Sequence, residues 1–266
     1  MTNVWHLGPP PLQRALHTLP LTAWRFYPVT GSTNDEALAW AAAGAPEGCF
    51  VLAEQQTRGR GRQGNRWWSR PAAALTFTFI ARPLPGERLY PGRFTAWGAI
   101  AVAETLEALG LSPALKWPND VLLEGRKVAG VLAEAAWEGE RPAAVVVGLG
   151  VNLAPEALPP AGATDFPAGC VADALGFSPP RWEFLVAVLR RMLWWRYRLS
   201  SPAFLQAWES RLAYRGQCVQ AGQVRGVLLG LDAHGGLRLR LPSGHTQTLY
   251  ALEGHLRLVD SQPKLP

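Results

Sequence analysis

One loop limits the folds that this chain can adopt. Residues 55–71 hold five arginines, no acidic residue and a G-x-G-x-x-G pattern. In a dinucleotide-binding fold, that pattern connects a strand to a helix. Here Pro71 and a strand-like segment at residues 75–80 follow it, so we exclude the dinucleotide-binding fold. We predict instead that residues 55–71, the arginine–glycine loop, join two buried strands at 49–54 and 75–80.

The chemistry of the arginine–glycine loop favours an anionic ligand. Guanidinium groups at this density repel one another unless an anion lies among them, and glycines allow backbone N–H groups to point into one concavity. We therefore expect the loop to bind phosphate and to close over a phosphorylated ligand, which would exclude water. Trp67 either stacks on a nucleobase or packs in the core. The alternative for the whole loop is a solvated basic segment or a nucleic-acid contact.

Lysine is rare in this sequence and is therefore informative. Of the 26 basic residues, 23 are arginine and only three are lysine. Lys116 begins the motif KWPND, and Lys127 begins the apolar segment KVAGVLAE. An ammonium group is a compact point charge, unlike the planar guanidinium group. We therefore expect Lys116 to contact phosphate and Lys127 to point at a ligand. The alternatives are a local Lys116–Asp120 pair in a polar turn and a strand-edge lysine at 127.

Other residues near these motifs have candidate roles. Asp120 is a candidate ligand for Mg²⁺, the usual partner of ATP phosphates. Gly130 would let a ligand approach the backbone closely. Ser32 and Thr33 precede an alanine-rich segment, and Thr33 with Glu36 fits a capping box. Helix capping therefore explains both hydroxyl groups before a ligand is invoked.

The pattern of apolar residues divides the chain into two parts. Strand-like and helix-like segments are mixed up to residue 213, whereas leucine and arginine alternate at 237–241, which is typical of short strands in a small β module. Predicted helices lie at 33–43, at 94–109 and after Pro180, a hairpin is predicted at 121–136, and irregular segments are predicted at 1–22 and 154–180. We predict an α+β protein with a mixed domain at 1–213 and a β domain at 214–266.

Composition narrows the function only slightly. The net charge of +6 and the pI near 9.6 permit nucleic acid, anionic lipid or phosphate ligands without choosing among them. The three cysteines are far apart and the five histidines are scattered, so we expect no disulfide framework and no structural metal. The sequence shows no signal peptide and no membrane-spanning run. We therefore expect a cytoplasmic protein with no membrane partner.

Four motifs together resemble those of the biotin–protein ligases, also called biotin–[acetyl-CoA-carboxylase] ligases. In order along the chain they read GRGRQGNRW, KWPND, KVAGVLAE and GLGVN. The resemblance covers roughly residues 22–262. It implies an α+β fold, with a mixed-sheet catalytic domain of the biotin/lipoate ligase type and a C-terminal SH3-like β-barrel. It also implies an ATP- and Mg²⁺-dependent ligase that activates biotin as biotinyl-5'-AMP. The acceptor implied is a lysine of the apo biotin carboxyl carrier protein, a subunit of acetyl-CoA carboxylase.

The resemblance also assigns roles to individual residues. The biotin-binding positions that it implies are Ser32, Thr33, Asn34, Gln56, Gly59, Arg60, Gly61, Arg62, Lys127 and Gly130. The ATP- or adenylate-binding positions are Trp67, Lys116, Asn119 and Asn152, catalytic roles fall to Lys127, Arg60 and Arg62, and Asp120 is assigned to Mg²⁺. One position departs from the family, because Asn65 follows Gly64 where the family has a second Gly-Arg pair. This departure leaves the pyrophosphate contacts of the loop open.

Three alternatives remain at this stage. A lipoate or octanoate protein ligase belongs to the same superfamily, although the arginine–glycine loop suits an ATP-derived adenylate. A nucleic-acid-binding protein would show aromatic and basic residues interleaved on an open face. A winged helix-turn-helix domain, present in some biotin ligases, would not fit in about 22 residues, so we expect no direct DNA binding. The sequence leaves the oligomeric state open, a homodimer included.

Overall fold

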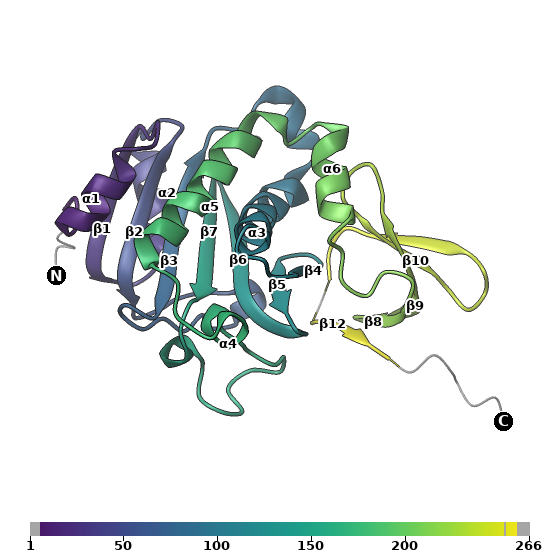
Figure 1. Cartoon of the computed structure of the whole chain (residues 1–266). Helices are drawn as coiled ribbons and strands as arrows, with labels where there is room; N and C mark the ends of the chain where they lie inside the picture. Colours follow the sequence, from purple (N-terminus) through teal and green to yellow (C-terminus); the bar gives the residue numbers. More distant parts are fainter. Residues whose placement is uncertain (1–5, 253, 260–266) are drawn as a thin grey trace.

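The mixed part of the chain forms one large sheet between two layers of helices. The structure is a computed structural model that describes residues 6–252 and 254–259, and within that range the sheet has seven strands in the order β1-β2-β3-β7-β6-β5-β4 (Figure 1). The strands are β1 (Ala23–Thr30), β2 (Cys49–Gln56), β3 (Ala74–Ala81), β4 (Ala114–Lys116), β5 (Asp120–Leu123), β6 (Arg126–Glu138) and β7 (Arg141–Asn152). Strands β1 and β2 are parallel, and the other neighbours are antiparallel.

Helices cover both faces of this sheet. Helix α2 (Thr33–Ala42) packs on one face, where its alanines contact Val51 and Val146. On the other face, α3 (Pro91–Glu107) lies against β6 and β7, and α5 (Arg181–Trp195) packs on α3. All eight residues of β3 are buried as a result. The predicted strands at 49–54 and 75–80, the hairpin at 121–136 and the helices after residues 33, 94 and 180 are confirmed.

Three short elements correct the predicted boundaries. Helix α1 (Pro10–Leu16) lies in the segment 1–22, which we expected to be irregular. The helix is stabilised because Leu12 and Leu16, one turn apart, are fully buried beside α5. Helix α4 (Val171–Leu175) likewise lies in the segment 154–180. Strand β4 was not predicted. It is only three residues long, too short to show an alternating pattern, and it is defined by its pairing with β5. Residues 1–5 lie outside the described residues.

The C-terminal part forms a second, antiparallel sheet. Its strands are β8 (Cys218–Ala221), β9 (Val224–Leu231), β10 (Leu237–Arg240), β11 (Thr246–Leu249) and β12 (Leu256–Leu258), in the order β11-β10-β9-β8-β12 within the described residues. The alternation predicted from the sequence is confirmed, since Leu237 and Leu239 are buried and Arg238 and Arg240 are exposed. The chain is therefore α+β, as predicted, while the boundary at 213/214 and the barrel description stay predictions.

One apolar core joins the two sheets. Trp208 on α6 (Pro202–Glu209) belongs to the same buried cluster as Trp117, in the turn between β4 and β5, and Leu237 of the small sheet. The Trp117 indole also donates a hydrogen bond to the carbonyl of Gly235 (3.0 Å). The small sheet is thus fixed against the end of the large sheet that carries β4 and β5 (Figure 1). In the part of the chain that the structure describes, we find no helix that is long and apolar enough to cross a membrane.

Candidate functional site

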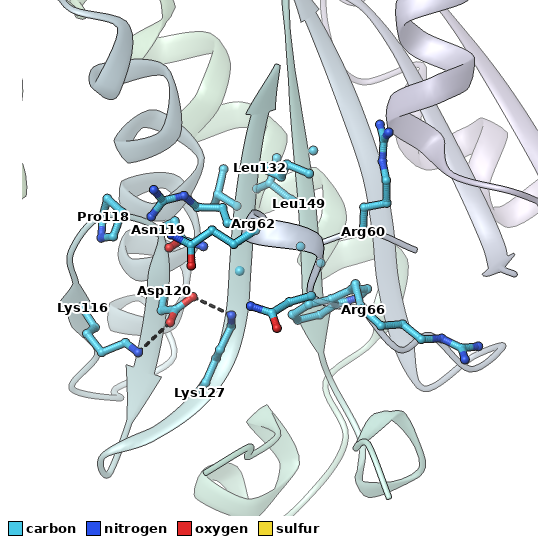
Figure 2. Close-up of a pocket in the computed structure, with 18 of the residues that line it drawn as sticks. Arg60, Arg62, Arg66, Lys116, Pro118, Asn119, Asp120, Lys127, Leu132 and Leu149 are labelled. Carbon is cyan, nitrogen blue, oxygen red and sulfur yellow. Dashed lines mark ion pairs between the residues drawn. The ribbon is translucent and has the colours of Figure 1, made fainter. Parts of the chain in front are cut away.

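A cavity opens where the arginine–glycine loop, the β4–β5 hairpin and strands β6 and β7 meet (Figure 2). Thirteen of the fifteen predicted site residues line it: Ser32, Thr33, Asn34, Gln56, Arg60, Gly61, Arg62, Trp67, Lys116, Asn119, Asp120, Lys127 and Gly130. Gly59 and Asn152 do not line this cavity. The motifs are therefore brought together in space, although they are spread over about a hundred residues of sequence.

Two lysines meet one carboxylate at the centre of the site. Lys116 Nζ lies 2.9 Å from Asp120 Oδ2, and Lys127 Nζ lies 2.6 Å from Asp120 Oδ1. Lys116 and Asp120 are buried, with 2% and 4% of their surface exposed, whereas 27% of the Lys127 side chain remains accessible. Figure 2 shows both ammonium groups directed at Asp120 from opposite sides. The three residues form the Lys116–Asp120–Lys127 triad, which carries a net positive charge in a buried place.

Burial and charge set the protonation of this triad. Burial raises the pKa of Asp120, but Lys127 and Lys116 outweigh it and hold that pKa below its ordinary value. Burial lowers the pKa of Lys116, which Asp120 opposes only in part. The Lys116 ammonium group also lies 3.7 Å from the centre of the Phe166 ring. A carboxylate between two ammonium groups is therefore ionised at neutral pH.

Local backbone geometry positions each member of the triad. Lys116 and Asp120 pair across the tight β4–β5 hairpin, which brings their side chains together. The Lys127 N–H donates to the carbonyl of Pro167 (2.8 Å), and the Gly169 N–H donates to the carbonyl of Lys127 (2.9 Å). The connection that follows β7 thus holds the first residues of β6 through hydrogen bonds with Pro167 and Gly169. The local Lys116–Asp120 pair that the sequence offered as an alternative is present, and Lys127 joins it.

The described residues do not form a protein-built site for Mg²⁺. No cluster of three histidine, cysteine, aspartate or glutamate side chains with ligand geometry occurs within residues 6–252 and 254–259. Both carboxylate oxygens of Asp120 lie against ammonium groups. Since a Mg²⁺ ion would have to displace a lysine there, these residues do not fit the metal, and we derive no step through it.

A buried polar network lies under helix α2. The Thr78 hydroxyl lies 2.8 Å from the Thr33 hydroxyl and 2.7 Å from Asn34 Oδ1. Thr33 in turn donates to Gln56 Oε1 through its backbone N–H (2.7 Å) and its hydroxyl (3.0 Å). The backbone N–H of Gln56 donates to Ser69 Oγ (2.8 Å). This network, which orients the amide of Gln56 toward the cavity wall, includes Thr78, a residue that the sequence did not single out.

The capping prediction for helix α2 was wrong in its detail. The helix begins at Thr33 as expected, but neither Ser32 nor Thr33 caps it with its side chain. Gln56 accepts the Thr33 N–H instead, and Glu36 accepts a hydrogen bond from the Thr30 hydroxyl (2.7 Å). A partner from another strand therefore replaces the local cap, which leaves the Thr33 hydroxyl oriented by tertiary contacts.

The loop arginines point in different directions. Arg60 lies 2.8 Å from Asp35 and 2.9 Å from Glu134, and Figure 2 shows it heading away from the triad. Arg66 stacks over the ring of Trp68, 4.2 Å from its centre. Arg62 extends beside the β4–β5 hairpin, and burial lowers its pKa. The pairing of Glu134, the last residue of KVAGVLAE, with Arg60 was not predicted. The two residues are 74 positions apart in the sequence, so no local pattern connects them.

Glycines form a flat surface on which two side chains lie. A Cβ atom on Gly150 would lie 2.1 Å from the Trp67 ring, and one on Gly148 would lie 2.0 Å from Asn34 Oδ1. Gly130, paired with Gly150 across β6 and β7, would meet the same Trp67 ring at 3.2 Å. Only glycine at 148 and 150 allows this approach. The buried Trp67 Nε1 has no hydrogen-bond partner among the described residues.

A second cavity adjoins the first. It shares Trp67, Asp120 and Lys127 with the first cavity, and its remaining wall comes largely from residues 157–168. Asn152 lines it and donates through Nδ2 to the carbonyl of Gly169 (3.0 Å). Gly59 lies where the two ends of the arginine–glycine loop pass close to each other. A Cβ atom there would lie 2.5 Å from the carbonyl oxygen of Trp67. The second cavity was not predicted, because the irregular segment 154–180 carries no motif.

Comparison with known proteins identifies the family. The model of the biotin/lipoate A/B protein ligase family matches residues 26–152. The chain is 38% identical over 229 residues to the biotin–[acetyl-CoA-carboxylase] ligase of Paracoccus denitrificans, an alignment that covers 81% of this chain and 93% of that protein. It is 39% identical over 178 residues to the protein of the same name from Mycobacterium tuberculosis, over 60% of this chain and 63% of that protein.

A solved structure agrees with these sequence relatives. The biotin protein ligase from Aquifex aeolicus in complex with biotin and ATP superposes with a TM-score of 0.75 at 26% identity, over 90% of this chain and 100% of that chain. The motif resemblance predicted from the sequence is thereby confirmed. On these findings, the chain is an enzyme that belongs to the biotin protein ligases of the biotin/lipoate A/B protein ligase family.

Proposed function

We propose that this enzyme joins biotin to ATP as biotinyl-5'-AMP and then transfers the biotinyl group to a lysine of a biotin carboxyl carrier protein. The observation that carries the proposal is the pair of adjoining cavities, both of which are lined by Trp67, Asp120 and Lys127. A bent ligand with one head in each cavity would pass its linkage beside the triad. Biotinyl-5'-AMP has that form, with a bicyclic head at one end and adenine at the other.

Each cavity matches one end of this ligand. The first cavity contains the network of Thr33, Gln56 and their neighbours, whose hydroxyl and amide groups suit the ureido group of biotin. The second is lined by Trp67, Trp68 and Phe166, whose flat rings suit stacking on adenine. The predicted biotin-binding positions thus fall in the first cavity, apart from Gly59. Asn152, predicted to bind the adenylate, lines the second.

The first chemical step is an attack on phosphorus. The biotin carboxylate oxygen forms a bond to the α-phosphorus of ATP, and the bond to the bridging oxygen breaks, so that pyrophosphate leaves with the electron pair. Two anions that repel each other must be held in line, and the new charge on the phosphate oxygens must be neutralised. We assign that work to Lys127, whose ammonium group lines both cavities and stays partly accessible.

Asp120 and Lys116 support Lys127 in this role. Asp120 holds the Lys127 ammonium group at 2.6 Å, and Lys116 supplies the second charge that keeps Asp120 ionised. The triad as a whole remains positive by one charge, which favours a bound phosphate. Arg62, beside the β4–β5 hairpin, adds a second positive charge at the cavity wall.

The second step transfers the acyl group. The neutral amine of the acceptor lysine attacks the carbonyl carbon of the mixed anhydride and an amide bond forms. The carbon–oxygen bond breaks, AMP leaves with the electron pair, and the proton lost by the amine nitrogen passes to solvent. Exclusion of water from the anhydride until the acceptor arrives is the role that we assign to the arginine–glycine loop. This loop closure stays a prediction.

Covalent labelling tests the proposal. The purified protein is incubated with biotin, MgATP and apo biotin carboxyl carrier domains, and covalent biotin is scored by mass. We expect a gain of one biotinyl group on one carrier lysine. A parallel incubation with lipoate serves as the specificity control, because transfer of lipoate in preference to biotin would support the lipoate ligase alternative and overturn the proposal.

A further inference from the structure

The tip of the arginine–glycine loop contacts the small sheet. The Gln63 side chain donates from Nε2 to the carbonyl of Leu252 and accepts at Oε1 from the N–H of Gly254 (3.0 Å). Both amide functions of Gln63 are therefore used on one backbone segment, 189 to 191 residues away in sequence. We name this pair of hydrogen bonds the Gln63 latch.

The backbone at Gln63 is held in an unusual conformation. Its φ and ψ are 56° and 37°, the left-handed region that non-glycine residues adopt rarely. Gly64 follows with a φ of 77°, so the tip turns sharply. A non-glycine residue keeps this strained backbone conformation only when contacts with the surrounding structure hold it there. The two hydrogen bonds of the latch are such contacts.

The segment that Gln63 contacts forms part of the site itself. Leu252, Gly254, His255 and Leu256 line the first cavity together with Arg62 and Lys127. His255 also lines the second cavity, and burial lowers its pKa, with Lys116 adding to that effect. The small sheet therefore supplies one wall of the cavity, and the loop that carries Arg60 and Arg62 is tied to that wall.

We propose that Gln63 is a positioning residue that couples the arginine–glycine loop to the wall of the small sheet, so that both enclose the adenylate together. This inference rests on the proposed function, since it deepens the same site. A glutamine suits the task because one planar amide presents a donor and an acceptor at fixed spacing. We therefore expect that loss of the Gln63 side chain loosens both the arginine–glycine loop and the wall from the small sheet around the ligand.

The test separates the side chain from the backbone. In Gln63→Asn, asparagine tolerates the left-handed backbone but is one methylene too short to reach both partners. In Gln63→Gly, the strain is relieved and the latch is absent. Gln247→Asn, an exposed position on β11, is the matched control. We expect both Gln63 variants to release biotinyl-5'-AMP about tenfold faster and to show a higher KM for ATP with a smaller change in kcat.

Hydrogen exchange gives a readout that needs no activity. The N–H of Gly254 should exchange faster in both Gln63 variants than in the wild-type protein and the control, with or without ligand. If Gly254 exchange and adenylate release in both variants equal those of the wild-type protein, the latch is overturned. If only Gln63→Asn is impaired, backbone strain rather than the latch is the cause, and the inference is also overturned. A wild-type protein that forms no adenylate would instead refute the proposed function, while the exchange of Gly254 would still test the latch.

Discussion

The Lys116–Asp120–Lys127 triad and the arginine–glycine loop carry the same kind of charge in opposite settings. Lys116 and Asp120 are almost fully buried, and each charge of the triad has a partner within 2.9 Å. In the loop, four of the five arginines are exposed, and the Arg60 side chain is 42% accessible even while it pairs with Asp35 and Glu134. The charges of the triad are buried and paired before a ligand arrives, whereas most arginines of the loop keep exposed side chains that can change partners, even though Gln63 ties the loop tip to the small sheet.

The energetic consequence follows from solvent screening. An exposed ion pair contributes about 0–1 kcal/mol, since water already solvates both charges. Removal of one partner from a buried pair costs about 3–5 kcal/mol, because the remaining charge is left uncompensated. The exposed Arg60 can therefore give up the carboxylates of Asp35 and Glu134 at small cost, whereas loss of a partner in the buried triad is costly. The following substitutions test this contrast.

The largest effect is expected at Lys127. Lys127→Ala should slow adenylate formation by about 10³-fold, because it removes the group that we propose neutralises charge on the phosphate oxygens. The fold should survive, since Lys116 still pairs with Asp120. Pyrophosphate release in a single turnover measures the rate, with Arg141→Ala at the exposed start of β7 as the control. A near-normal rate in Lys127→Ala would remove Lys127 from its role.

The next effect concerns the stability that the triad confers. Asp120→Asn leaves two neighbouring ammonium groups without a carboxylate, so the free energy of unfolding should fall by about 3–5 kcal/mol. Because the folded-state pKa of Asp120 is lowered, its contribution is present at neutral pH and is lost only as the pH falls through that lowered value. Urea unfolding from pH 7 to pH 3 measures both. An unchanged midpoint at pH 7 would show that the triad is not a stabilising unit.

A smaller effect is expected at Gly150, beside the Trp67 ring. Gly150→Ala would bring a methyl group within 2.1 Å of the Trp67 ring, so the ring must move and the stacking on adenine that we propose should weaken. Since stacking of a base on an aromatic side chain is worth about 1–3 kcal/mol, ATP should bind about 5- to 150-fold more weakly. Calorimetry compares this variant with Gly86→Ala, where a Cβ meets no atom within 4 Å. Equal ATP affinity in the two variants would contradict the proposed stacking of Trp67 on adenine.

The smallest effect is expected in the loop. Asp35→Asn removes a partner of exposed Arg60, and the free energy of unfolding should change by less than about 1 kcal/mol. Glu134 remains as a partner at 2.9 Å. The comparison with Asp120→Asn under identical urea conditions sharpens the contrast between the regions. A loss in Asp35→Asn as large as that in Asp120→Asn would show that the loop is as rigidly paired as the triad.

Local patterns in the sequence were sufficient for much of this fold. The hairpin at 121–136, the alternating leucines of β10 and the helix after Pro180 follow from periodicity and turn residues alone. The meeting of the motifs at one cavity was predicted only through the family resemblance. Lysine scarcity pointed to Lys116 and Lys127, both of which lie in the triad.

The contacts that were missed are long-range. Gln56 replaces the expected local cap of α2, Glu134 pairs with Arg60, and Gln63 reaches the small sheet. None of these partners lies within one helical turn or one hairpin of the other, so no periodicity reveals them. The contribution of residues 157–168 to the second cavity was missed for the same reason. The path of an irregular segment depends on long-range contacts, which no local sequence pattern shows.

Mass spectrometry of the enzyme after incubation with biotin and MgATP, in the absence of any acceptor, tests directly whether this site makes the adenylate. We expect biotinyl-5'-AMP bound at one molecule per chain in the wild-type protein, and almost none in Lys127→Ala. Absence of bound adenylate in the wild-type protein, or equal amounts in both proteins, would contradict this expectation.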